Sequence, residues 1–413
     1  MKRKFGDWKC RYLLLAILLI LTAGCDFFEE DNGDVVLFDR LVSYNELGTL
    51  TSDQISNIYP SELSAFLAHD VVVYRVVYRT ETPVGDQVQA SGVVLAPNRS
   101  GASRMVSLHR STIFHELEAP SNVNLNNPDQ SNMVWANFAP VMASAGFITV
   151  MPDLLGWGES SSLFHPYMIT VSDEVVAYDM LLAAMDLTED AEILWNNDLF
   201  VTGYSQGAST AMALLRGIEA DASGRFEVKA ASVGGGAYNL EALAETLLEQ
   251  DELSFSPFYV YFLKAYRNTY FPDRTLGSFL NSPYDNIIVN DQLFRGGFFG
   301  NEIAERLTHV TSDLLLNSFR NNFITSNTVS GQESEFRSIL SDNDLSSFRV
   351  EIPLRIYHGE DDEILPYSEA LQSAQNLEDA GSGNLEFITV QNGTHLSSVA
   401  VYLQETFFWF LEL

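Results

Sequence analysis

The residues with the clearest chemical meaning lie at 203–207, where the sequence reads Gly-Tyr-Ser-Gln-Gly. They follow a short apolar segment, 198–202, and precede a segment rich in Ala, Leu and Met, 208–218, which together predict a tight turn from a strand into a helix. Such a turn exposes the Ser205 hydroxyl above the N-terminus of the helix. The helix dipole and the backbone N–H of Gln206 can stabilise a negatively charged oxygen there. The pattern therefore predicts a serine nucleophile.

A serine hydroxyl is a weak nucleophile, so it needs an adjacent base, and that base needs an anion to orient it. Two later strands end in suitable residues. A strand expected at 353–357 leads into the acidic run 360–363, and a strand expected at 385–390 leads into a Gly-Thr-His turn that ends in His395. Because the C-terminal ends of parallel strands meet at one edge of a sheet, we expect an acid and His395 beside Ser205.

The acidic run contains four candidates for the orienting anion, Glu360 to Glu363. The resemblance of 358–366 to the form His-Gly-x-x-Asp-x-x-Leu-Pro selects Asp362, with Asp361 as the alternative. A solvated turn or a calcium site would explain three of the four acids equally well. Neither explains why the run follows a strand.

Seven histidines are candidates for the base, and only His395 follows the final strand. His69 precedes a strand, and His109 ends an early strand. His115 and His165 lie in loops before residue 203. His309 lies in the inserted segment, and His358 starts the acidic loop. We therefore assign the base to His395.

Strands and helices alternate along most of the chain, which predicts an α/β fold with a mostly parallel central sheet and right-handed crossovers. Strands are expected at 71–79, 88–96, 104–109, 147–151, 198–202, 228–233, 353–357 and 385–390. Helices are expected at 133–145, 171–186, 208–218, 367–380 and 397–411.

The alternation stops between 238 and 349, where the sequence is helical in pattern and rich in Phe and Tyr. This segment is either a helical subdomain with its own core or a cap over the serine, lined for the apolar part of a substrate. Both interpretations can hold, and we favour the cap. The expected core is then split into a first part, 61–237, and a second part, 350–413.

The N-terminus, 1–24, has a basic start, an apolar run and small residues, as in a secretory signal peptide. Its apolar run is too short to span a bilayer. The residues before Cys25 are similar to a bacterial lipobox, so we expect a lipid anchor on Cys25 and a place in the bacterial cell envelope, outside the cytoplasm. An ordinary signal peptide with an incidental cysteine is the alternative. Residues 25–60 are expected to form an acidic tether that merges into the domain edge.

Composition narrows the class of protein further. The 413 residues are 46% hydrophobic, 12% aromatic and 19% charged, with a formal net charge of −32. A surface this acidic repels phosphate backbones, so nucleic acid is not an expected partner. Two cysteines, Cys10 and Cys25, leave the expected mature chain without an internal disulfide or a cysteine-based metal site. No oligomeric state can be inferred.

Over roughly residues 74–400 the chain resembles an α/β hydrolase, and specifically the bacterial and fungal secretory lipase family. The resemblance rests on residues 78–80 with 90–97, on 152–158 with 165–167, and on 203–207. It implies hydrolysis of carboxylic esters, often acyl esters, beneath a helical cap and without a cofactor or metal. The expected partner is a small-molecule or lipid ester.

The resemblance also implies a second oxyanion donor, a backbone N–H that follows the early strand at 104–109. Families of this fold often carry His-Gly there, whereas this chain has Arg110. We name Ser111 as the donor, with Arg110 as the substitute. Two alternatives to ester hydrolysis stay open. The same triad serves amides, which allows a serine peptidase acting on short peptides, and the departure at Arg110 allows a catalytically inactive surface-binding module of the same fold.

Overall fold

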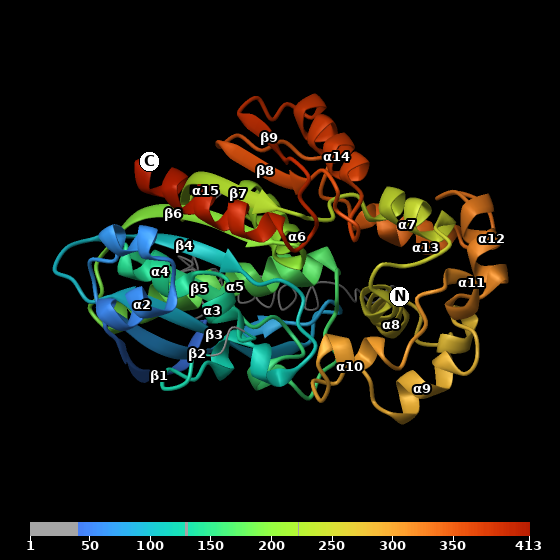
Figure 1. The fold of residues 1–413 in the computed structure, drawn as a ribbon, viewed down its shortest axis with the longest axis horizontal. Coiled ribbons are helices and arrows are strands. Elements are labelled where there is room, and N and C mark those ends of the chain that lie inside the picture. Colours follow the sequence, from blue (N-terminus) through green and yellow to red (C-terminus); the bar gives the residue numbers. More distant parts are fainter. Residues whose placement is uncertain (1–39, 129–130, 222) are drawn as a thin grey trace, which may run out of the picture. The chain divides into compact units, whose positions relative to one another are not determined.

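A single sheet carries the residues singled out above. The computed structural model describes residues 40–413 except 129–130 and 222, and within that part of the chain nine strands form one sheet. The strands are β1 (Leu41–Leu50), β2 (Val71–Glu81), β3 (Gln87–Pro97), β4 (Ser103–His109), β5 (Phe147–Pro152), β6 (Trp195–Tyr204), β7 (Glu227–Gly234), β8 (Leu354–Gly359) and β9 (Leu385–Val390). Their order is β1-β2-β3-β5-β4-β6-β7-β8-β9 (Figure 1).

The pairing of neighbouring strands changes from antiparallel to parallel once across the sheet. Strands β1, β2, β3 and β5 pair in antiparallel fashion, and all pairs from β5 through β4 to β9 are parallel. The predicted α/β fold with a mostly parallel sheet is thus confirmed. All strand ends that precede the expected site residues belong to the parallel part, so they point to the same edge.

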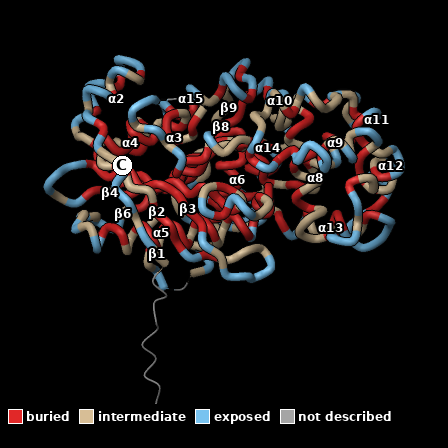
Figure 2. The backbone as a smooth tube through the Cα atoms, turned by 90° about the horizontal axis from the view of Figure 1, so that it is seen from below, coloured by how far each residue is buried: buried red, intermediate tan, exposed pale blue. Residues whose placement is uncertain are grey.

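Helices cover both faces of the sheet and bury its strands between them (Figure 2). One face packs against α5 (Thr170–Asp190), α6 (Gln206–Ala220) and α14 (Tyr367–Asp379). The other packs against α2 (Ser52–Ile58), α3 (Met133–Ala136), α4 (Ala139–Ser144) and α15 (Ser398–Glu412). Short 3₁₀ turns occur at η1 (Ser61–Phe66), η2 (Glu116–Glu118), η3 (Pro120–Asn122), η4 (Gly158–Ser160) and η5 (Leu276–Ser278).

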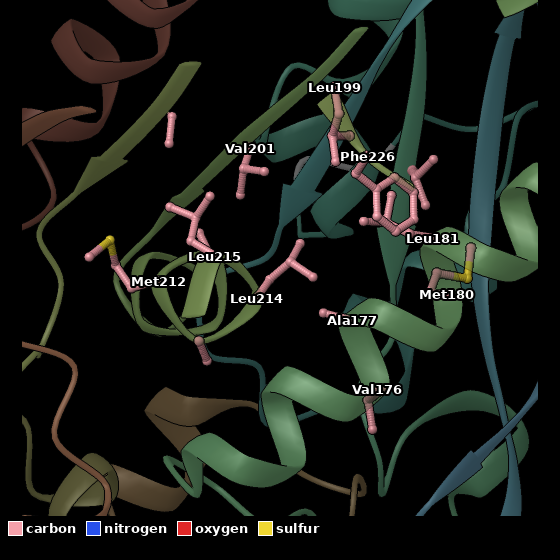
Figure 3. Packing of buried hydrophobic residues seen from close by; sticks show 14 of the residues in the cluster. Val176, Ala177, Met180, Leu181, Leu199, Val201, Met212, Leu214, Leu215 and Phe226 are labelled. Atoms are coloured by element: carbon pink, nitrogen blue, oxygen red, sulfur yellow. The ribbon is translucent and has the colours of Figure 1, made fainter. Parts of the chain in front are cut away.

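The side chains of strand β6 pack against the helices on both faces of the sheet. Leu199 and Val201 point towards α5 and α6, where they meet residues such as Leu214 (Figure 3). Between them, Phe200 points to the opposite face and contacts Phe410 of α15, with ring centroids 4.8 Å apart. Successive side chains of a strand alternate between its faces, so a continuous apolar run is required when both faces are buried.

The segment between β7 and β8 consists of helices, as predicted. They are α7 (Leu240–Glu249), α8 (Ser256–Tyr270), α9 (Tyr284–Asn290), α10 (Gly300–Ala304), α11 (Thr311–Leu314), α12 (Asn317–Thr325) and α13 (Ser334–Asp342). Their aromatic residues form a separate core in which Phe336 contacts Phe271, Phe279, Phe319 and Phe323. We refer to residues 235–353 as the cap. It lies beside the end of the parallel strands (Figure 1).

Most predicted elements are confirmed, and one is wrong. The helix expected at 133–145 is interrupted after α3, because Phe138 adopts a left-handed backbone conformation (φ 60°) and Pro140 stands in the first turn of α4. Proline has no N–H to donate to a preceding turn, so it favours a new helix start over continuation.

Residues 41–50, expected in the tether and domain edge, form the edge strand β1. Cys25 and the expected signal peptide lie outside the described residues. Among the described helices, none combines the length and the apolar character needed to cross a bilayer.

Candidate active site

Ser205 stands at the turn between β6 and α6. Its backbone has φ 58° and ψ −121°, a conformation that residues other than glycine rarely adopt. The two neighbouring positions, 203 and 207, must be glycine because a side chain there would collide with nearby backbone atoms. A Cβ atom on Gly203 would lie 2.1 Å from the carbonyl oxygen of Gly207, and one on Gly207 would lie 2.2 Å from the carbonyl oxygen of His109. The turn is therefore as tight as the Gly-x-Ser-x-Gly pattern predicts.

The side chains of Ser205, His395 and Asp362 form a continuous chain of hydrogen bonds. His395 Nε2 lies 3.0 Å from Ser205 Oγ, and His395 Nδ1 lies 2.7 Å from Asp362 Oδ2. His395 belongs to the turn after β9 and Asp362 to the loop after β8. Three residues far apart in sequence thus meet at the edge where their strands end.

Asp362 is the acid that reaches His395. Its side chain is buried, whereas Glu360, Asp361 and Glu363 are exposed. Burial alone would raise the pKa of Asp362, but the bond to His395, the N–H of Leu365 and the neighbouring His358 outweigh it and hold the pKa below its ordinary value. The carboxylate is therefore charged at neutral pH and suited to orient an imidazole.

Two further side chains hold the acid and the base in place. His358 places Nε2 2.8 Å from the Leu365 carbonyl oxygen, to which it donates, and burial lowers its pKa, so it is neutral. Glu363 accepts a hydrogen bond of 3.1 Å from the backbone N–H of His395. From the sequence, His358 could be placed only at the start of the acidic loop and Glu363 only among the four candidate acids, so neither contact could be foreseen.

The end of β4 runs directly beside the serine. The close approach of Gly207 to the His109 and Arg110 carbonyl oxygens brings this backbone against the start of α6. The Ser111 hydroxyl donates to the Tyr204 carbonyl oxygen at 3.2 Å. The first backbone N–H groups of a helix have no partner within the helix, so that of Gln206 is available to a ligand. Gln206 and Ser111 are thus both brought to the serine.

The Arg110 side chain does not enter the site but lies buried beneath it. Its Nη1 donates to Gln206 Oε1 at 3.2 Å, and its Nε donates to the carbonyl oxygen of Asp153 at 2.9 Å. Gln206 Nε2 in turn lies 2.8 Å from His165 Nε2, and His165 Nδ1 lies 2.7 Å from the carbonyl oxygen of Leu155.

This arrangement fixes the proton positions. A carbonyl oxygen only accepts, so His165 Nδ1 carries the proton, Nε2 accepts from the amide of Gln206, and the amide oxygen faces Arg110. Burial and the nearby Arg110 place the pKa of His165 well below its ordinary value, so the ring stays neutral. We call Arg110, Gln206 and His165 the Gln206 chain of hydrogen bonds. Sequence reasoning missed it, although a buried polar side chain directly after Ser205 needs hydrogen-bond partners.

An apolar cavity opens at Ser205 and extends into the cap. It measures about 940 Å³ including its mouth, and Ser205 and Gln206 lie on its wall. The rest of the lining consists of Tyr167, Met168, Ala237, Leu240, Leu243, Ala244, Leu247, Leu248, Leu253, Phe258, Tyr259, Phe262, Leu263, Leu315, Phe319, Phe323, Phe336, Ile364 and Leu365. The described residues contain no group of three or more His, Cys, Asp or Glu side chains placed to hold a metal ion.

Comparison with known families gives a match to the secretory lipase family over residues 136–412. A search of curated proteins gives no match.

Several solved structures have the same fold. A putative hydrolase from Legionella pneumophila is 23% identical, with a TM-score of 0.79, over 90% of this chain and 98% of that one. The ligand-bound rice cell wall degrading esterase LipA from Xanthomonas oryzae is 21% identical, with a TM-score of 0.74, over 89% and 96%. Candida antarctica lipase A in its closed state is 18% identical, with a TM-score of 0.66, over 91% and 81%. At these identities the likeness establishes the fold.

The Gln206 chain leads to a prediction about the reactivity of Ser205. We expect Arg110→Met to slow the labelling of Ser205 by a fluorophosphonate about 10²-fold, because a small shift of Gln206 would misplace its backbone N–H, which we expect to stabilise the developing charge. Arg110→Lys keeps the charge but cannot make both hydrogen bonds, so we expect an intermediate rate. The rates are measured by in-gel fluorescence on samples whose thermal unfolding shows them to be folded. Equal rates for all three proteins would contradict the role given to Arg110.

Proposed function

The chain belongs to the secretory lipase family, and we propose that it hydrolyses carboxylic esters with Ser205, His395 and Asp362 as its catalytic residues. The observation that carries the proposal is the pair of hydrogen bonds, 3.0 Å and 2.7 Å, that joins these side chains at the wall of an apolar cavity. A nucleophile, a base within reach of it and an anion that orients the base are the three parts required for acyl transfer.

In the first half of the reaction, His395 Nε2 takes the proton from Ser205 as its oxygen attacks the ester carbonyl carbon. Asp362 stabilises the imidazolium that forms. The negative oxygen of the tetrahedral intermediate accepts hydrogen bonds from the N–H groups of Gln206 and Ser111. The carbon–oxygen bond of the ester then breaks, the imidazolium gives its proton to the leaving alcohol, and an acyl-enzyme remains.

The second half repeats these steps with water. His395 removes a proton from a water molecule, which attacks the acyl-enzyme, and the same N–H groups bind the oxyanion. The bond to Ser205 breaks, the serine regains its proton from His395, and the carboxylic acid leaves. No step needs a cofactor or a metal ion.

The cavity indicates which part of the substrate it holds. Apart from Ser205 and Gln206 its lining is apolar or aromatic, and most of it comes from the cap. Burying an alkyl chain there contributes about 0.8 kcal/mol for each methylene. We therefore infer that the cavity holds the acyl group and that the enzyme accepts long acyl chains.

The catalytic assignment is tested on a p-nitrophenyl ester. We expect Ser205→Ala to abolish turnover, and Asp362→Asn to lower kcat about 10³- to 10⁴-fold, because the amide cannot stabilise the imidazolium. Asp361→Asn is the matched control: it makes the same substitution one residue away, on an exposed side chain, and should leave kcat close to wild type. Turnover retained by folded Ser205→Ala would reject the proposal.

The acyl assignment is tested with p-nitrophenyl butyrate and p-nitrophenyl palmitate. Leu247→Trp fills part of the cavity, so we expect the ratio of kcat/KM for palmitate over butyrate to fall roughly tenfold or more. Ile324→Trp, an equally large substitution at an exposed position of α12 outside the cavity lining, should leave the ratio unchanged. If the ratio does not respond to Leu247→Trp, the acyl chain binds elsewhere.

We further propose that Cys25 is lipidated and anchors the enzyme to the cell envelope outside the cytoplasm. The support is the signal-like sequence before Cys25 and membership of a family described as secretory. We expect the full chain to sediment with membranes and Cys25→Ser to appear in the soluble fraction, as followed by fractionation and blotting. A variant that remains fully membrane-bound would argue against the anchor.

A further inference from the structure

A second pocket lies on the cap, on the side of α8 that faces away from the apolar cavity. It measures about 900 Å³ including its open mouth, and is lined by Lys264, Arg267, Asn268, Thr275, Leu276, Val289, Gln292 and Arg295. The cavity is lined by α8 residues 258, 259, 262 and 263, whereas the pocket is lined by 264, 267 and 268. At about 100° per residue these two sets lie on opposite sides of the helix.

The charge of this pocket is opposite to that of the protein. The chain contains 55 acidic and 23 basic residues, yet three cations and no carboxylate line the pocket. Ion pairs join eight other Lys and Arg side chains to carboxylates in the described part of the chain, but none involves Lys264, Arg267 or Arg295. An acidic protein would normally neutralise a cluster of this kind with its own Asp and Glu.

Backbone oxygens hold each of the three cations. Lys264 Nζ donates to the Leu293 carbonyl oxygen at 2.9 Å, and Arg295 Nη2 donates to that of Ser162 at 3.1 Å. Arg267 donates to the carbonyl oxygens of Arg274 and Pro272. Neutral carbonyl groups leave the positive charges uncompensated. They also leave donors unused, because an ammonium has three N–H bonds and a guanidinium has five.

Burial and the neighbouring cations both perturb Lys264. Burial is the larger cause, the positive charges of Arg295 and Arg267 act in the same direction, and together they lower the pKa of Lys264 to about 8. The aromatic ring of Phe164 lies 5.1 Å from Nζ and gives only a weak compensation. A bound anion would reverse this effect, since it favours the charged form of the lysine.

We propose that this pocket binds the phosphate group of a small molecule or of a lipid headgroup. A phosphate carries up to two negative charges on oxygens that point in several directions, which matches three cations from α8 and from the loop after α9. The Thr275 hydroxyl and the Asn268 amide are neutral groups in the same wall that can donate further hydrogen bonds. A role in holding the cap together would explain Arg267, but not the exposed guanidinium of Arg295 on the same pocket.

The proposal is tested by calorimetric titration of the full chain with methyl phosphate and with dimethyl phosphate at constant ionic strength. Methyl phosphate represents a soluble phosphate monoester, and dimethyl phosphate represents the diester of a lipid headgroup. We expect saturable binding of at least one of them. Lys264→Gln and Arg295→Gln should each weaken it about tenfold, the effect of losing one charge-assisted hydrogen bond. Arg99→Gln removes an exposed positive charge outside the pocket and should leave binding unchanged.

Each outcome has a defined meaning. Tighter binding of methyl phosphate assigns the pocket to soluble phosphate esters, and tighter binding of dimethyl phosphate assigns it to lipid headgroups. Absence of binding of both, or an equal loss in Arg99→Gln, overturns the proposal. Arg295 is exposed and makes one hydrogen bond, so we expect Arg295→Gln to fold. That variant still tests the proposal if Lys264→Gln does not fold. Turnover of p-nitrophenyl butyrate should be unchanged in folded variants, since none of these residues lines the cavity.

Discussion

The close approach of α6 to the end of β4 is the constraint on which the site depends. With hydrogen in place of a side chain at Gly203 and Gly207, the helix starts against the β4 backbone, and Ser205 at the turn has a positive φ of 58°. That conformation lifts the hydroxyl above the sheet edge towards His395. The same contact brings the helix N-terminus and the backbone after His109 together around one point. A methyl group at either glycine would separate these parts by displacing the whole helix.

The sequence predicted the fold well wherever local pattern and burial agree. Helices on both faces of the sheet require continuous apolar runs such as that of β6, so most strands could be inferred from composition and spacing. Two features could not. Strand β1 alternates weakly because it is an edge strand that is half exposed, and the break before α4 arises at Phe138, a residue type with no preference for a left-handed backbone.

In the site, too, some residues could be predicted from the sequence and others could not. Ser205, Asp362 and His395 could be named because each follows a recognisable strand, and the structure places them within hydrogen-bond distance of one another. Their ester chemistry is our proposal. The buried support could not be foreseen, because Arg110, Gln206 and His165 come from three loops or helix starts with no shared pattern. Arg110, which in the sequence was only a departure from the His-Gly of related families, is a buried arginine that donates a hydrogen bond to the side chain of Gln206.

The position of the cap in the chain has a consequence for how such enzymes diverge. The cap occupies the connection between two parallel strands that are already neighbours, β7 and β8. Loop-closure entropy grows only with the logarithm of loop length, so each doubling of such a connection costs about 0.6 kcal/mol. Helices can thus be added, lost or exchanged there with little effect on the stability of the sheet. Evolution, or a protein engineer, can exchange the helices that line the apolar cavity without moving Ser205, Asp362 or His395.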